Sequence, residues 1–197
     1  MAMAVAPHPP GPPETRKFTA DDVWRMLEAG ILDADEPYEL LDGELHYVSP
    51  PDPLHAKVVN RLTMLLVPVY GPRGFVVRTQ QPIGGIINAI PEPDVAIVTL
   101  AAENADTHPQ ADQAVLLVEV AHTRLPRDLR KGAVYAIAGA PEYWIVDVNR
   151  NVVTFYAGPN ADGTWRHVTE VGIDGRLPLP QTDGQTLAVA RILMPAG

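Results

Sequence analysis

Hydrophobic and polar positions along the chain follow two different periods, which predict short helices and strands from about residue 19 onward. Helical spacing recurs in three segments, and apolar or alternating runs typical of strands recur in seven. The helical segments are 19–30, 54–70 and 127–138, and the strand-like runs are 75–79, 94–100, 115–120, 142–148, 152–156, 165–171 and 186–190. This order predicts an α/β domain in which helices pack against a mixed β-sheet.

A β-hairpin is predicted over residues 38–48, because Asp42-Gly43 lies between two runs of alternating polarity. Pairing across that turn, with Leu40 opposite Leu45, places one set of side chains toward the core and another on the opposite face. The first set is Tyr38, Leu40, Leu45 and Tyr47, and the second set is Glu39, Glu44 and His46. In the simplest interpretation, the second face is exposed to solvent.

Two of the predicted helices have a recognisable end or face. Thr19 and Asp22 have the spacing of a capping box, which predicts that the first helix begins there. In the segment 127–138, apolar residues at helical spacing predict the side that faces the sheet. These residues are Leu129, Ala133, Ala136 and Ile137.

The composition excludes several classes of site and of location. The chain has 197 residues, enough for one domain, and no cysteine. The lack of cysteine excludes a disulfide scaffold, a thiolate zinc site, an iron–sulfur cluster and a cysteine nucleophile, and it fits a reducing compartment. No apolar run approaches the roughly 20 residues of a membrane span, and the N-terminus lacks the features of a signal peptide. We therefore expect a cytoplasmic protein without a membrane partner.

Proline and charge divide the chain into a leader and a domain of acidic character. Five of the 21 prolines fall within the first thirteen positions, so residues 1–18 are expected to form a disordered leader and residues 19–197 a single domain. The chain carries 15 Lys and Arg against 24 Asp and Glu, a net charge of −9. That balance argues against broad, sequence-independent binding of nucleic acid but allows a local basic patch.

Two carboxylates lie where an ordinary apolar core would not place them. Asp94 stands at the start of the strand-like run EPDVAIVTL, and Glu119 lies inside the apolar run LLVEVA. A buried carboxylate is costly unless it is paired or bound to a metal. The structural alternatives are an ion pair between Glu119 and an arginine, and an Asp94 that only begins a strand.

A basic segment, RLPRDLRK, follows the strand that carries Glu119. Taken alone, such a segment is usually a solvated helix start. Next to two acids, its cations could hold a phosphate while a divalent metal lies between the carboxylates. Oxygen ligands without cysteine favour a hard ion, Mg²⁺ or Mn²⁺, which activates bound water, and a lysine could orient or deprotonate that water.

The stretch from PDVAIV through LLVEVA to RDLRKGAVYAIAGAPEYWIVDV resembles the PD-(D/E)XK nuclease superfamily. More narrowly, the hairpin YELLDGEL, His55 and the block YAIAGAPEYWIVD are similar to a bacterial family of proposed restriction endonucleases, over about residues 19–156. The resemblance implies a restriction endonuclease-like core, a mixed β-sheet flanked by helices, with an N-terminal hairpin and a small C-terminal β extension.

The resemblance also implies a set of site residues. Asp94 and Glu119 would bind Mg²⁺ or Mn²⁺, and the carbonyl of Val120 would complete the site. The superfamily's usual lysine, two positions after the Glu, is replaced by Ala121, and Lys131 on the following helix takes its place. Accessory residues are Glu44, or else Glu39, as a further metal or water contact, and His55, Arg124 and Arg127 near the phosphate.

The leading hypothesis is thus a metal-dependent endonuclease that hydrolyses phosphodiester bonds of nucleic acid, in particular DNA, and acts as a homodimer. An alternative is an inactive protein of the same fold that binds nucleic acid or a protein partner, which the net charge of −9 and the unusual His122 favour. A third is a purely structural or interaction domain, with Glu119 in a buried ion pair. Metal affinity distinguishes these hypotheses, because only the enzyme requires it.

Overall fold

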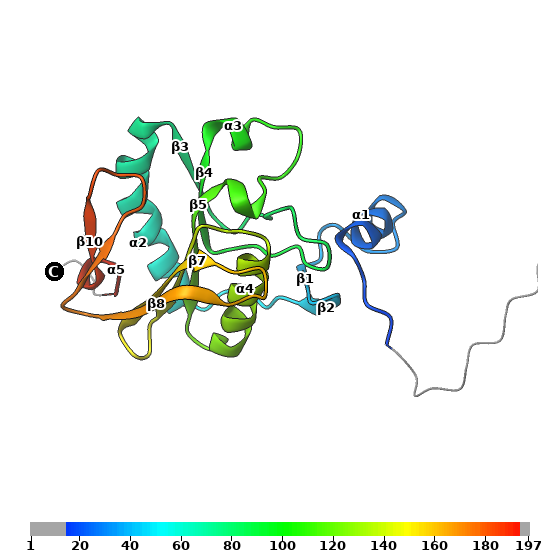
Figure 1. Cartoon of the computed structure of the whole chain (residues 1–197). Coiled ribbons are helices and arrows are strands. Elements are labelled where there is room, and N and C mark those ends of the chain that lie inside the picture. Colours follow the sequence, from blue (N-terminus) through cyan, green and yellow to red (C-terminus); the bar gives the residue numbers. More distant parts are fainter. Residues whose placement is uncertain (1–14, 194–197) are drawn as a thin grey trace, which may run out of the picture.

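A six-stranded mixed sheet forms the centre of the molecule in the computed structural model, which describes residues 15–193 (Figure 1). In spatial order its strands are β3 (Phe75–Arg78), β4 (Val95–Thr99), β5 (Ala114–Ala121), β6 (Glu142–Asp147), β7 (Val152–Pro159) and β8 (Trp165–Gly172). β5 and β6 are parallel and are joined by helix α4 (Leu125–Ile137), whereas all other neighbours in this sheet are antiparallel. The predicted α/β architecture is confirmed.

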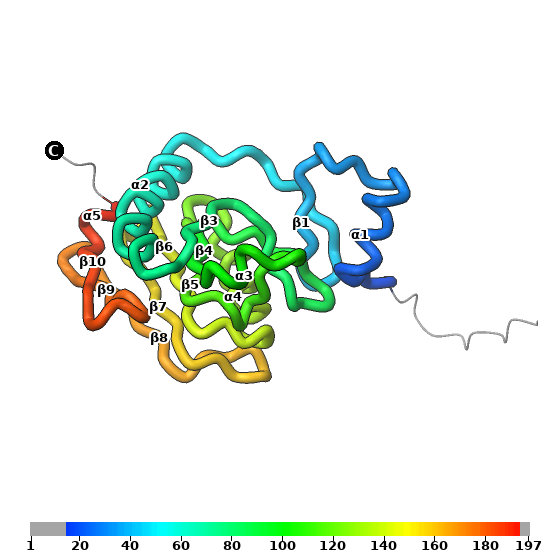
Figure 2. Tube along the Cα trace, turned by 90° about the horizontal axis from the view of Figure 1, so that it is seen from above, coloured from blue at the N-terminus to red at the C-terminus, as the bar shows by residue number. Residues whose placement is uncertain are grey.

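Two helices cover the two faces of this sheet, α2 (Pro53–Tyr70) on one and α4 on the other (Figure 2). Because successive residues of a strand point to opposite faces, β5 contributes to two separate cores. Val118 packs in the core beneath α2, together with Leu62 of that helix. Leu117 packs in the core beneath α4, together with Tyr135 of that helix. Every residue of β5 is buried, as the continuous apolar run predicted.

The N-terminal elements lie to one side of the sheet (Figure 1). They are helix α1 (Ala20–Glu28) and the hairpin of β1 (Tyr38–Leu41) and β2 (Glu44–Tyr47). Thr19 and Asp22 form the predicted capping box, and Leu40 pairs with Leu45 in the predicted register. The hairpin is joined to the body by an isolated bridge between Leu40 and Ile90 and by the amide of Gly43, which donates to the carbonyl of Asn88 at 2.7 Å.

The predicted orientation of the hairpin faces is wrong in part. Tyr47, expected on the core side, is 67% exposed, whereas Glu39, expected on the solvated side, is only 4% exposed. The reason lies outside the hairpin, because the face that carries Glu39 meets Arg127 and Lys131 of α4. The alternation of polar and apolar residues therefore predicted the register of the two strands, but it did not predict which part of the molecule each face of the hairpin contacts.

The predicted inward face of α4 is also wrong in part. Leu129 and Ile137 are 49% and 61% exposed, and the buried side of the helix instead contains Asp128 and Lys131. Ala136 is buried as predicted. The helix turns a charged side inward because Lys131 pairs there with the carboxylates of Glu39 and Glu119. Hydrophobic periodicity does not predict such a partner.

The remaining elements are short. They are α3 (Leu100–Glu103), β9 (Arg176–Pro178), β10 (Thr186–Ala188), α5 (Val189–Leu193) and 3-10 turns at 71–73 and 111–113. β9 and β10 form the expected small C-terminal β extension, but the strand predicted over 186–190 ends at Ala188 and continues as α5. Most of the predicted leader, residues 1–14, lies outside the described residues. No helix within 15–193 has the length and apolar character needed to cross a membrane.

Candidate active site

A cleft of about 480 Å³ opens between the hairpin and the end of the sheet where β4 begins and β5 ends. Its walls come from β1, the segment that leads into α2, the loop before β4, the end of β5 and the first half of α4. Its ionisable lining residues are Glu39, Asp52, His55, Glu92, Asp94, Glu119, His122, Arg124, Arg127, Asp128 and Lys131.

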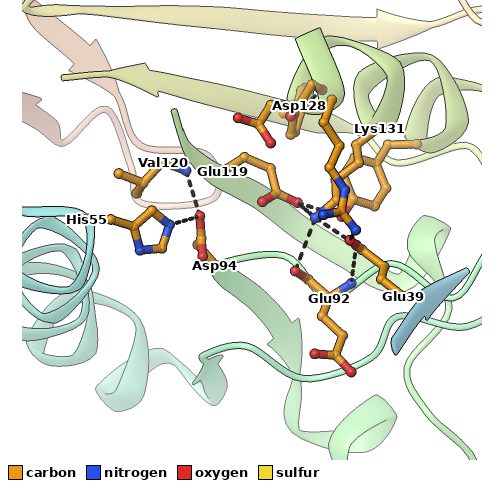
Figure 3. Close-up of polar contacts among 11 residues, drawn as sticks. Glu39, His55, Glu92, Asp94, Glu119, Val120, Asp128 and Lys131 are labelled. Atoms are coloured by element: carbon orange, nitrogen blue, oxygen red, sulfur yellow. Dashed lines mark hydrogen bonds and ion pairs between the residues drawn. The ribbon is translucent and has the colours of Figure 1, made fainter. Parts of the chain in front are cut away.

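Asp94 is fixed between β5 and α2 (Figure 3). It immediately precedes β4 and is 7% exposed. The β4–β5 ladder ends at the pair Val95–Val118, so the amide of Val120 lies beyond it and donates instead to Asp94 Oδ2, at 2.8 Å. The same oxygen lies 2.9 Å from Nε2 of His55, which is in the first turn of α2. Asp94 therefore replaces a missing strand contact and joins three elements at the cleft.

Glu119 projects from β5 toward α4 and is 3% exposed. Its Oε1 accepts hydrogen bonds from Lys131 Nζ at 2.9 Å and from the hydroxyl of Tyr135 at 3.1 Å. Lys131 and Tyr135 lie four residues apart, so the helix presents both on one side. The partner of Glu119 in the structure is thus a lysine, not the arginine of the structural alternative.

Glu39 brings the hairpin into the same cluster (Figure 3). Its Oε1 lies 2.7 Å from Lys131 Nζ and accepts a hydrogen bond from the amide of Glu92 at 3.2 Å. Its Oε2 pairs with the guanidinium of Arg127. Lys131 thus lies between two carboxylates from different parts of the chain, Glu39 and Glu119.

Eight of the nine residues that the sequence singled out line this one cleft. They are Glu39, His55, Asp94, Glu119, Val120, Arg124, Arg127 and Lys131. Glu44 does not line it, and its Oε1 lies 2.6 Å from Nζ of Lys17, with both side chains half exposed. Glu44 shares a face with Glu39 but lies next to the turn and pairs with Lys17, so the structure brings Glu39 to the site in its place.

Sequence reasoning missed several residues of the cleft. Asp52 caps α2 through Oδ1, which accepts from the amides of Leu54 and His55, and its Oδ2 lies 2.8 Å from Nδ1 of His122. Asp52 directly before Pro53 is a recognisable helix-start signal, but its pairing with His122, 70 residues away, leaves no local pattern. Asp128, also missed, is 6% exposed and lines the cleft beside Lys131.

Burial and opposite charges set the ionisation of this cluster. Burial acts to lower the pKa of Lys131, but the carboxylates of Glu119 and Glu39 outweigh it and raise that pKa above its usual value. Burial raises the pKa of Asp128 to about 6, against the opposing effect of Lys131. The hydrogen bond to Asp94 raises the pKa of His55. Lys131 is therefore a stable cation among acids.

The donor set of the cleft fits a hard divalent metal. Among residues 15–193, no group of three or more His, Asp or Glu side chains forms a complete metal cage. Mg²⁺, however, is commonly held by one or two carboxylates together with waters and substrate phosphates. The hydrogen bonds described above engage Oδ2 of Asp94 and Oε1 of Glu119, which leaves Oδ1 and Oε2 for another partner. Among the lining residues, six carboxylates outnumber the three Lys and Arg cations, and this excess favours a cation.

The sequence of this chain matches the model of a known protein family. The family model Uma2, described as "Putative restriction endonuclease", matches residues 24–190, which include the whole cleft. The chain belongs to the Uma2 family. No curated protein matches the chain in sequence.

Solved structures show the fold of this Uma2 protein. A crystal structure described as a putative nuclease of DUF820 from Anabaena variabilis matches with a TM-score of 0.71 and 13% identity, over 89% of this chain and 97% of that chain. The fold is therefore restriction endonuclease-like, as the sequence resemblance implied. The type IIG restriction endonuclease BpuSI matches with a TM-score of 0.40 and 15% identity, over 71% of this chain and 15% of that one.

Proposed function

We propose that this Uma2 protein is a metal-dependent endonuclease that hydrolyses phosphodiester bonds of DNA. Membership in a family of proposed restriction endonucleases supports a nuclease. The observation that carries the finer assignment is the pair of buried carboxylates, Asp94 and Glu119, each with one oxygen uncommitted, beside the buried ammonium of Lys131.

The metal site would consist of Asp94, Glu119 and the carbonyl of Val120. A residue in an antiparallel strand turns its N–H and C=O toward the same neighbour. Because the amide of Val120 donates to Asp94, its carbonyl faces the same side of β5. These are oxygen donors, which suit Mg²⁺ or Mn²⁺. When bound, such an ion polarises a phosphoryl oxygen and lowers the pKa of coordinated water.

Lys131 would act on the attacking water as an orienting cation. Its ammonium has three donors, and the structure commits them to Glu119, to Glu39 and, at 3.4 Å, to the carbonyl of Glu92. With a raised pKa, Lys131 stays charged and cannot serve as a base in this state. The arriving water and phosphate would exchange with its longest contact, the carbonyl of Glu92.

Two arginines would steady the phosphate. Arg124, at the N-cap of α4, lines the cleft and takes part in none of the ion pairs among residues 15–193. It is therefore available to an anion at the positive end of that helix. Arg127 is held by Glu39 and would reach the phosphate only by sharing that contact.

Glu39, in this proposal, anchors cations and is not a metal ligand. Both of its oxygens are occupied, by Lys131 and the amide of Glu92 on one side and by Arg127 on the other. Glu44, paired with Lys17 outside the cleft, has no role in it.

The first test is calorimetric titration of the protein with Mn²⁺ and Mg²⁺. We expect binding that is lost in Asp94→Asn, a variant that keeps the size of the side chain and an acceptor for the amide of Val120. Asp106→Asn, which removes an exposed acid that does not line the cleft, is the matched control and should bind as the native chain does. A ligand at 100 times its Kd stabilises the fold by roughly 2.7 kcal/mol, so a rise in Tm gives an independent readout.

Cleavage of plasmid DNA in the presence of Mn²⁺ or Mg²⁺ completes this test. Asp94→Asn and Glu119→Gln should both abolish it while leaving the circular dichroism spectrum unchanged. Persistent cleavage by either variant would refute the assigned site. Absence of metal binding by the native chain, with and without DNA, would instead favour the inactive binding protein.

A further inference from the structure

The strand at one margin of the sheet, β8, is long, and no strand among residues 15–193 pairs with its outer edge. It spans Trp165–Gly172 and pairs with β7 on its inner side, and it is the last strand of the sheet order (Figure 2). Its five central residues, 166–170, are all exposed. An edge strand of this length offers unpaired N–H and C=O groups to another strand, and proteins usually block such an edge with charges.

The charges on β8 are arranged symmetrically about its centre. Arg166 lies two residues before Val168, and Glu170 lies two residues after it. Because side chains alternate along a strand, these three residues share one face. Val168, between the two charges, is 55% exposed.

We propose that β8 is the contact through which two copies of this chain pair, antiparallel and about a twofold axis at Val168. In that register Val168 lies opposite Val168 of the second copy, and Arg166 lies opposite its Glu170. The pairing uses residues 165–171 on both copies, and the two six-stranded sheets become continuous.

Charge complementarity identifies a second copy as the occupant. Opposite charges directly across an antiparallel pair attract, whereas like charges repel. Two like charges at these positions would repel their counterparts in the second copy. Arg166 of each copy instead lies opposite Glu170 of the other, which gives two attractive pairs. Glu170 is also held by Arg150 of its own chain, at 2.7 and 3.0 Å, so in the dimer Arg166 of the second copy would share this carboxylate with Arg150.

Mass in solution and charge reversal test this proposal. By light scattering after gel filtration, the native chain should show twice its mass of 21.3 kDa. Arg166→Glu and Glu170→Arg each create two like-charge pairs across the axis, and each should weaken dimerisation about tenfold or more. An equimolar mixture of the two variants restores both opposite-charge pairs and should form a heterodimer. Both residues are exposed, so circular dichroism should show that each variant folds.

A single cysteine reports the register directly. The native chain has no cysteine, so Val168→Cys carries one thiol per chain. Residues opposite each other in an antiparallel pair have Cα atoms about 4.5–5.5 Å apart, which is within the range for a disulfide. We expect rapid oxidation to a covalent dimer. Met64→Cys, at a residue 77% exposed on α2, is the control for random collision and should form no covalent dimer at that rate.

Two results would overturn the proposal. One is a native chain that stays monomeric at high micromolar concentration and a Val168→Cys variant that is oxidised no faster than Met64→Cys. The other is a dimer that persists unchanged in Arg166→Glu, because the interface would then lie elsewhere. None of these measurements uses metal or DNA, so their outcome is independent of the proposed nuclease activity.

Discussion

The two faces of the central sheet are equally buried but differ in chemistry. Beneath α2, the side chains of β5 and β6 meet Val, Leu and Ile residues, and the contact is almost wholly apolar. Beneath α4, the neighbouring positions of the same strands lead from an apolar patch into the cluster of Glu39, Glu119 and Lys131. Glu119 and Val118 are adjacent in sequence and both are almost fully buried, yet they belong to opposite environments.

This difference shows how one strand can serve stability and function together. On the α2 face, burial of apolar area stabilises the fold without directional demands. On the α4 face, burial of Glu39, Glu119 and Lys131 is favourable only because the ammonium of Lys131 lies at hydrogen-bond distance from both carboxylates. The first face should tolerate changes that keep volume, whereas the second should respond to any change of charge.

The largest expected effect is on the charged face, in Lys131→Met. Cleavage should fall by about 10²- to 10⁴-fold, the usual range for loss of a group that handles the reacting water. Stability should fall by roughly 3–5 kcal/mol at pH 8, because Glu39 and Glu119 remain buried without their shared cation. Guanidinium unfolding at pH 8 and pH 5 measures this, and the deficit should shrink at pH 5, because burial raises the pKa of Glu119 and its carboxyl takes up a proton more readily there.

Arg130→Met is the matched control for that prediction. Arg130 is the neighbour of Lys131 on α4 but is exposed, so its loss should leave cleavage and stability nearly unchanged. If Arg130→Met and Lys131→Met lost cleavage and stability equally, the loss would come from any change of charge on α4 and not from the buried cluster.

On the apolar face, Leu62→Ala should lower stability while leaving the site intact. Leu62 is fully buried beneath α2, and such a truncation typically costs about 2–5 kcal/mol. Urea unfolding should show this loss, and calorimetry below the unfolding transition should show unchanged metal affinity. Met64→Ala, on the exposed side of the same helix, should change neither. Loss of metal binding in folded Leu62→Ala would mean that the two faces are not separable.

The features that could be predicted from the sequence are those that depend on residues close together in the chain. The capping box at Thr19, the hairpin register and the buried run of β5 rest on neighbours in sequence, and the structure has all three. The inward face of α4 was misassigned because periodicity weighs only apolar residues, whereas Lys131 is turned inward by charge.

Residues of the cleft were singled out where a sequence motif contains them, and they were missed where only the folded chain brings them together. The sequence singled out Asp94, Glu119 and Lys131, and all three line one cleft. The choice between Glu39 and Glu44 depends on which of them α4 reaches, and nothing within the hairpin encodes that. The pair of Asp52 and His122 joins positions 70 residues apart and likewise has no local signal.

A smaller effect is expected at the border between the two faces, in Asp52→Ala. This change removes the cap of α2 and the partner of His122, and we expect Tm to fall by about 2–4 °C. The hydrogen bonds with His122 and the amide of His55 lower the pKa of Asp52 to about 2. The Tm of the native chain should therefore exceed that of Asp52→Ala above pH 4, and this difference should disappear as the pH falls toward 2. Asp52→Asn, which retains a capping oxygen, should lose less, and thermal unfolding followed by circular dichroism distinguishes the two.

An effect of similar size is expected at Glu142, an acid that lies on the apolar face without a cation. It begins β6, on the same side as Trp144, and its Oε2 is buried with no hydrogen-bond partner among residues 15–193. Burial raises the pKa of Glu142 to about 7. Burial alone acts on the pKa of Glu142, whereas at Glu119 on the other face the nearby ammonium of Lys131 opposes the effect of burial.

Because the pKa of Glu142 is raised on folding from 4.5 to about 7, its contribution to stability is fully present below pH 4.5 and is lost as the pH rises through 7. Glu142→Gln cannot ionise, so it should exceed the native chain in Tm by about 2–4 °C at pH 8 and match it at pH 4.5. Glu170→Gln, at an exposed acid, should show no such gain at pH 8. If the Tm of the native chain and the Tm of Glu142→Gln changed with pH in the same way, folding would not favour the neutral form of Glu142. The apolar face would then hold this acid in its charged form.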